Sequence, residues 1–200
     1  VKESEVPSAE KARQMFVEGL DQWDGLFQHA SEMLMRQPGI ISLHATTTTN
    51  AMHYAHQQTS NDETRRFLLL QNAAFLTMFR DRGAVKEGVK IDEFEPVEGV
   101  PSIEEIFAEV SGNKVVAAQK ALAYLKSAKN PRPFFDEAQR LIYLKGSGSY
   151  DYKFSSAVLE DYCHITGGMR DRFPAASVYW LQGSKKKDTD LVARTPAALG

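Results

Sequence analysis

Apolar residues recur at helical spacing along most of the chain. The clearest stripe lies between residues 21 and 36 and comprises Trp23, Leu26, Phe27, Ala30, Met33 and Leu34. This spacing places apolar side chains on one face of a helix. The same pattern predicts helices over residues 8–20, 21–36, 40–57, 63–82, 102–110, 113–125, 134–145, 154–165 and 169–181. No segment alternates convincingly as a strand does, so we expect an all-α protein, an irregular multi-helix bundle or array of about eight antiparallel helices.

Turn-forming residues between the helices predict how the chain is organised. Residues 83–101 are rich in glycine, proline and charge and are long for a simple connection. They indicate a linker or flap (84–101) between an N-terminal helical subdomain with the histidine cluster (1–83) and a C-terminal helical subdomain (102–182). Ser102, followed three residues later by Glu105, predicts a capping box at the start of the second subdomain. Residues 183–200 are expected to form an irregular tail.

Composition narrows the functional classes. Hydrophobic residues make up 42% of the 200 residues, which is enough for a substantial core without disulfides or structural metals. The 24 Lys and Arg against 26 Asp and Glu give a net charge of -2, which argues against a dedicated nucleic-acid-binding protein. No run of about 18 apolar residues occurs, so no transmembrane segment is expected. The single cysteine, Cys163, excludes an intramolecular disulfide.

The segment Leu43–His56 contains three of the five histidines, namely His44, His53 and His56, together with the threonine run Thr46–Thr49. Threonine hydroxyls bond back to carbonyls of the preceding turn, which is compatible with a helix here. At about 100° per residue, His44 and His53 point to opposite sides, whereas His53 and His56 share a face. The segment therefore offers two separate sites and not one three-histidine site. The alternative for each histidine is a buried or capping residue with a satisfied hydrogen bond.

A second candidate group lies more than a hundred residues further on. Glu160 and His164 are four residues apart, so both side chains would project from one face of a continuous helix, a spacing at which two side chains can ligate one metal. Asp161 and His164 are a competing pair at a spacing of three. The alternative is an acid–histidine pair that only stabilises the helix.

Together the two groups predict a metal site between helices. The candidate ligands are His44, His53, Glu160 and His164, of which His53 and Glu160 are also the candidate catalytic residues. Histidines with a carboxylate suit a divalent ion such as iron, zinc or manganese. Open coordination positions would then activate water or oxygen.

Three segments carry a resemblance to a known group of proteins: EMLMRQPGI (32–40) leading into the histidine segment, DETRR through LQNAAF (62–75), and DYKFSSAVLEDY (151–162). Together they resemble the C-terminal half of a family of longer, uncharacterised, mostly helical bacterial proteins, some of them exported. The resemblance covers most of the chain and implies an N-terminal half with further histidines. A site here would then be shared with a missing N-terminal segment or a partner chain. His29 and His56 do not match the pattern of the family.

The N-terminus does not decide the localisation. Residues 1–5 do not resemble a signal peptide and lack an initiator Met, so we expect a processed product or a piece of a larger protein. Both the bacterial cytoplasm and export remain open.

The sequence leaves two functional classes. The favoured one is a metal-dependent enzyme, foremost an oxidoreductase, with its site between helices. The alternative is a non-catalytic helical module that binds a partner chain or a small apolar ligand, in which the histidines would be buried, hydrogen-bonded and far apart. The distance from His44 or His53 to Glu160 or His164 separates the two classes, because ligands of one ion lie within about 5 Å of each other.

Overall fold

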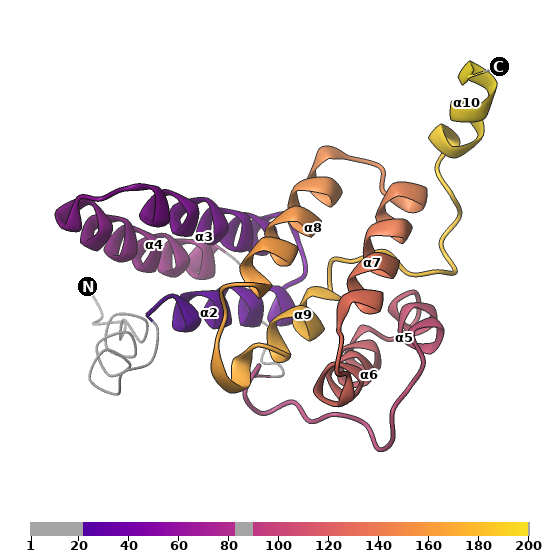
Figure 1. The fold of residues 1–200 in the computed structure, drawn as a ribbon, viewed down its shortest axis with the longest axis horizontal. Coiled ribbons are helices and arrows are strands. Elements are labelled where there is room, and N and C mark those ends of the chain that lie inside the picture. The colour runs from indigo at the N-terminus through magenta and orange to yellow at the C-terminus, as the bar shows by residue number, and fades with distance from the viewer. Residues whose placement is uncertain (1–21, 83–89, 200) are drawn as a thin grey trace.

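The structure is a computed structural model that describes residues 22–82 and 90–199. Over these residues it contains nine α-helices, one 3-10 helix and no strand, which confirms the all-α prediction (Figure 1). The elements are α2 (Gln22–Arg36), α3 (Ile40–Gln58), α4 (Asp62–Arg82), α5 (Ile103–Val110), α6 (Lys114–Ser127), α7 (Arg132–Lys145), α8 (Ser149–Tyr162), η1 (Gly167–Met169), α9 (Arg172–Ser177) and α10 (Asp190–Leu199). The helix predicted over residues 8–20 lies outside the described residues.

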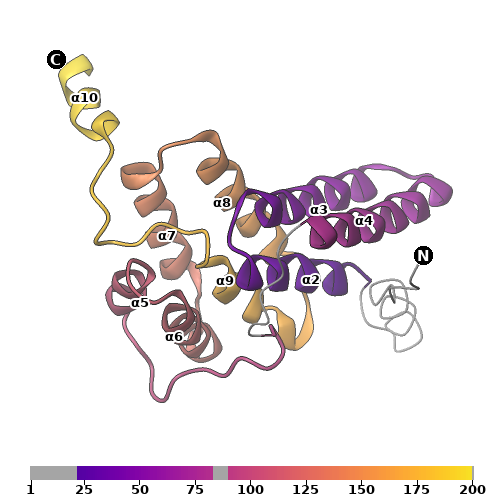
Figure 2. The ribbon, with the colours of Figure 1, turned by 180° about the vertical axis from the view of Figure 1, so that it is seen from behind.

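Helices α3 and α4 form a hairpin that projects to one side of the molecule, as both views show (Figures 1 and 2). The face that α3 buries is unusually polar, since Ser42, Thr46, Thr49 and His53 are all buried on it. The hydroxyl of Thr46 donates to the Ser42 carbonyl at 3.2 Å, and the Thr49 hydroxyl donates to a carbonyl one turn back at 2.9 Å. These bonds satisfy the hydroxyls inside the helix and explain how the threonine run remains helical and buried.

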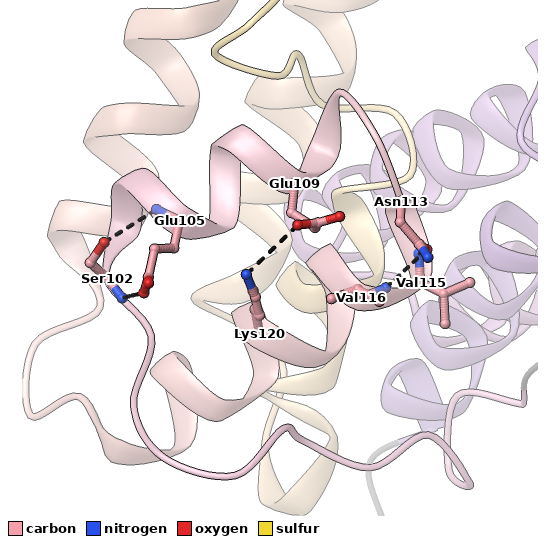
Figure 3. Close-up of polar contacts among 7 residues, drawn as sticks. All are labelled: Ser102, Glu105, Glu109, Asn113, Val115, Val116 and Lys120. Atoms are coloured by element: carbon pink, nitrogen blue, oxygen red, sulfur yellow. Dashed lines mark hydrogen bonds and ion pairs between the residues drawn. The ribbon is translucent and has the colours of Figure 1, made fainter.

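Local sequence signals set the starts of α5 and α6 (Figure 3). Ser102 accepts from the backbone N–H of Glu105 at 3.2 Å, and the Glu105 carboxylate accepts from the Ser102 N–H at 2.8 Å. This is the predicted capping box. Asn113 caps α6 in the same way by accepting from the N–H groups of Val115 and Val116. Each of these contacts is made within three residues of chain.

One hydrophobic core runs through both predicted subdomains. Its buried members come from every α-helix from α2 to α9, among them Phe27, Leu43, Leu76, Phe107, Leu122, Phe134 and Phe154. Helix α9 packs against both α2 and α6 and so joins the N-terminal helices to the C-terminal ones. The described part of the chain therefore forms a single packed array.

The segment predicted as an irregular tail is bound to the body before it ends in a helix. The backbone N–H of Ser184 donates to the Phe107 carbonyl at 2.9 Å, and the buried Lys145 ammonium reaches Asp188 Oδ1 at 2.6 Å. At Gly183 the chain lies so close to Ser111 that an added Cβ would be 2.6 Å from the Ser111 nitrogen. The tail then continues into α10, which stands away from the other helices (Figure 1).

Helix α8 differs from its predicted span of 154–165 at both ends. It begins at Ser149, where the Asp151 carboxylate accepts from the Ser147 N–H at 2.9 Å and gives the first turn a negative charge. It ends at Tyr162, so His164 lies in the turn that follows and not on the helix. Gly167 extends this turn with a φ of 62°, a conformation that favours glycine.

Candidate functional site at the α3–α8 interface

Helices α3 and α8 lie side by side and run in the same direction. Near the start of both, the ring of His44 faces Tyr150 with centroids 5.6 Å apart. Further along, Asn50 reaches the last turn of α8, and at the far end the rings of His53 and His164 are 4.9 Å apart. Because the contacts advance along both helices together, α3 and α8 have the same sense along the interface, unlike the expected antiparallel neighbours, while their axes cross at an angle (Figure 1). We call this line of contacts, from His44 to His164, the α3–α8 interface.

The His53 ring is buried and is held by two aromatic side chains of α2. It meets Phe27 edge-on with centroids 5.1 Å apart, and Trp23 at 4.9 Å. Only 7% of His53 is exposed to solvent. The ring of His56 lies against the other side of this group, 5.3 Å from Trp23. Packing on several sides fixes the direction of the His53 nitrogens.

A buried carboxylate of α2 fixes the turn that carries His164. Asp24 accepts from the backbone N–H of Thr166 at 3.1 and 3.2 Å, and from the Thr166 hydroxyl at 2.6 Å. The same turn is closed on its other side, where the Asp161 carbonyl accepts from the N–H groups of His164 and Ile165. Helix α2 thus positions both histidines, His53 by packing and His164 through its turn.

The two histidines meet at the amide of Gln57. The Gln57 Nε2 atom lies 3.2 Å from His164 Nδ1 and 3.5 Å from His53 Nε2. An amide nitrogen has two hydrogens and donates one to each ring when both ring nitrogens carry a lone pair. The point at which the two rings and the amide meet is accessible, because Gln57 is exposed.

Two turns before Gln57 on α3, Asn50 holds two carboxyl groups. Its amide nitrogen donates to Glu160 Oε2 at 3.1 Å and to Asp161 Oδ1 at 2.9 Å. The pKa of Asp161 is raised to about 8, because burial raises it strongly, the hydrogen bond from Asn50 lowers it, and the nearby charge of Glu160 raises it. At neutral pH this carboxyl is therefore mostly protonated. Within the described part of the chain its Oδ2 atom is buried without a hydrogen-bond partner.

The structure brings together two of the four predicted ligands. His53 and His164 are in contact, whereas Glu160 is directed to Asn50 and His44 lies at the opposite end of the interface against Tyr150. Over residues 22–82 and 90–199, no three His, Cys, Asp or Glu side chains are placed to hold one metal ion. The four predicted residues therefore do not form one group there, because helical phasing separates His44 from His53 as the sequence indicated.

Sequence reasoning missed several residues of this site. Trp23 was assigned to a core stripe, and nothing local marked Asp24, Asn50 or Gln57 as functional. Their partners lie 107 to 142 residues away in the chain. The only indication that α3 meets the end of α8 was the prediction that His53 and His164 belong to one site.

Comparisons with protein-family models, curated proteins and solved structures give no match to this chain. The resemblance to longer bacterial proteins therefore stays a prediction. In the part of the chain that the structure describes, no helix is long and apolar enough to cross a membrane.

Proposed function

We propose that His53 and His164 bind a divalent transition metal and that the protein is a metal-dependent enzyme, with an oxidoreductase as the first candidate. The observation that carries the proposal is the convergence of His53 Nε2 and His164 Nδ1 on the Gln57 amide, at 3.5 and 3.2 Å. A metal binds imidazole through an unprotonated ring nitrogen, and one nitrogen of each ring lies beside the Gln57 amide here. The contact between the rings also meets the distance criterion that separates the two functional classes.

The residues present suit a metal site in which protein donors occupy only some of the coordination positions. His53 and His164 would be the imidazole ligands, and Gln57 would be the third donor after its amide turns so that the oxygen, in place of Nε2, faces the rings. Imidazole suits zinc and iron, whereas manganese prefers oxygen ligands, so zinc or iron is favoured over manganese. A bound metal of this kind supplies Lewis-acid or redox chemistry through its open positions.

The carboxyl groups beside the histidines have distinct roles in this proposal. Glu160 is exposed and accepts a hydrogen bond from Asn50, so it is the candidate acid–base residue. Asp161 is buried and bonded to the same amide, and it fixes where Asn50 lies. His44 has no part in the site.

Calorimetric titration with Zn²⁺, together with metal analysis of the purified protein, tests the proposal. We expect His164→Ala to weaken Zn²⁺ binding at least tenfold and Gln57→Ala to weaken it less. His44→Ala is the matched control, since it removes an α3 histidine at the other end of the interface and should leave binding unchanged. Equal Zn²⁺ affinity in His164→Ala and the wild type would overturn the proposal. It would favour the alternative, a non-catalytic module that binds a partner chain or a small apolar ligand.

A further inference from the structure

The middle of the α3–α8 interface is hollowed into an open groove, between the His44 end and the His53 end. The groove is lined by Thr47, Asn50, Tyr152, Lys153, Ser156 and Ala157. The lining residues of α3 are three apart, as are Lys153 and Ser156 on α8, so each helix presents one face to it. Asn50 belongs both to this groove and to the carboxyl group described above.

We propose that this groove binds the anionic group of a small organic molecule, a carboxylate or a phosphate, with Lys153 as its counter-charge. The lining contains one ammonium, three hydroxyls and one amide, and no carboxylate. Ammonium and hydroxyl groups are the donors that carboxylates and phosphates accept from.

Lys153 is available for this role. Its side chain is exposed, and within the described residues it makes no salt bridge. By contrast, the ammonium of Lys145 is buried against Asp188, and that of Lys120 faces Glu109. The hydroxyl of Thr47 donates to the Leu43 carbonyl at 3.1 Å, so its hydrogen is already engaged. The donors left for an anion are therefore chiefly Lys153 and Ser156.

The position of the groove relates its ligand to the histidine pair. Thr47 precedes His53 by six residues, which corresponds to about 9 Å along a helix. A molecule held at Lys153 by its anionic group would extend past Asn50 toward the histidine pair. The exposed Glu160 carboxylate shares the Asn50 amide and lies beside this path, so the anionic group must sit at the Lys153 and Ser156 end and an uncharged part of the molecule must pass Asn50. If the proposed function holds, this molecule is the substrate, a small organic acid or phosphate ester.

Anion binding is tested without metal, by NMR titration of the full chain with inorganic phosphate and, separately, with succinate. We expect Lys153→Met, which keeps the length of the side chain and removes its charge, to weaken binding of the better anion at least tenfold. Lys129→Met, a change of an exposed lysine outside the groove, is the matched control and should bind as the wild type does. The stronger of the two anions identifies the ligand as a phosphate or a carboxylate.

The two proposals fail separately. His164→Ala should lose Zn²⁺ binding and keep anion binding, whereas Lys153→Met should do the reverse. The groove proposal is overturned, whatever the zinc result, if Lys153→Met binds the anion as tightly as the wild type does. It is also overturned if the wild type shows no binding at an anion concentration of about 50 mM. Binding of an uncharged sugar with the affinity of the anions would overturn it too, because the charge of Lys153 would then contribute nothing.

Discussion

Two polar regions of the molecule are built in opposite ways. At α5 and α6 the capping contacts join residues two or three positions apart and lie on the surface (Figure 3). At the α3–α8 interface the hydrogen bonds join residues 107 to 111 positions apart, and the linked bond from Asp24 to Thr166 spans 142. The first kind stabilises a single helix by about 1 kcal/mol. The second kind fixes how separate helices meet, and it places polar groups where losing a partner costs more.

The largest effect on the free energy of unfolding is expected at Asp161. Its carboxyl is buried, whereas the capping residues of α5 and α6 are exposed. A carboxyl whose folded pKa is raised to about 8 contributes its full stability below about pH 4 and loses it as the pH rises toward 8. Asp161→Asn cannot ionise, so its stability should not show this loss. At pH 7 the variant gains as much as about 4 kcal/mol over the wild type as an upper limit. Urea unfolding between pH 4 and 9 measures the difference.

The control is Asp92→Asn, which changes an exposed aspartate. Its free energy of unfolding should depend on pH as that of the wild type does. Glu160→Gln removes a neighbouring negative charge that raises the pKa of Asp161, so the loss of stability should become smaller and should end at a lower pH. Parallel curves for Asp161→Asn and the wild type would show that Asp161 is ionised in the folded protein.

A smaller effect is expected at Asp24. Asp24→Ala removes the acceptor of the Thr166 N–H and hydroxyl and should lower the free energy of unfolding by about 2–3 kcal/mol. It should also change the NMR signal of His164 and weaken Zn²⁺ binding, since the turn that carries His164 is then no longer held to α2. Asp24→Asn keeps one acceptor oxygen and should restore part of both. A His164 signal unmoved in Asp24→Ala would show that this turn is held without Asp24.

The smallest effect is expected at the capping box. Ser102→Ala removes the bond from the Glu105 N–H and should cost about 1 kcal/mol, measured by urea unfolding. Zn²⁺ and anion binding should be unchanged, because no contact of the α3–α8 interface depends on α5. The matched variant Ser127→Ala, which changes an exposed serine at the C-terminal end of α6, should lower the free energy of unfolding by less. A change in Zn²⁺ affinity in Ser102→Ala would mean that the two polar regions are coupled.

The same comparison explains how much the sequence predicts. Apolar spacing located α2 to α8, but it made the helix at residues 169–181 longer than α9 and missed α10 in the tail. The capping box and the threonine bonds were predictable because each donor lies within four residues of its acceptor. Phasing within one helix also separated His44 from His53 correctly. Local rules failed at α8, where the helix ends at Tyr162 and leaves His164 in a turn. The actual constraint there is Asp24, and helical spacing carries no information about so distant a residue.

The site itself was predicted only in part for the same reason. His53 and His164 were selected by residue type, which a sequence displays directly. The roles of Gln57 and Asn50 depend on which helix lies opposite, and amide side chains are common on helix surfaces. Glu160 was assigned as a ligand from its spacing to His164, but the end of α8 places the two in different directions.

The hydrogen bond between Asp24 and Thr166 also bears on how the protein is made. At about 5–20 residues per second, Thr166 is added to the chain roughly 7–28 s after Asp24, since the two are 142 residues apart. The histidine pair therefore cannot assemble while α2, α3 and α4 leave the ribosome. Throughout that interval Asp24 lacks Thr166, and Asn50 and Gln57 of α3 lack their partners at the end of α8. The site is thus among the last parts of the protein to become native, whichever ligand it binds.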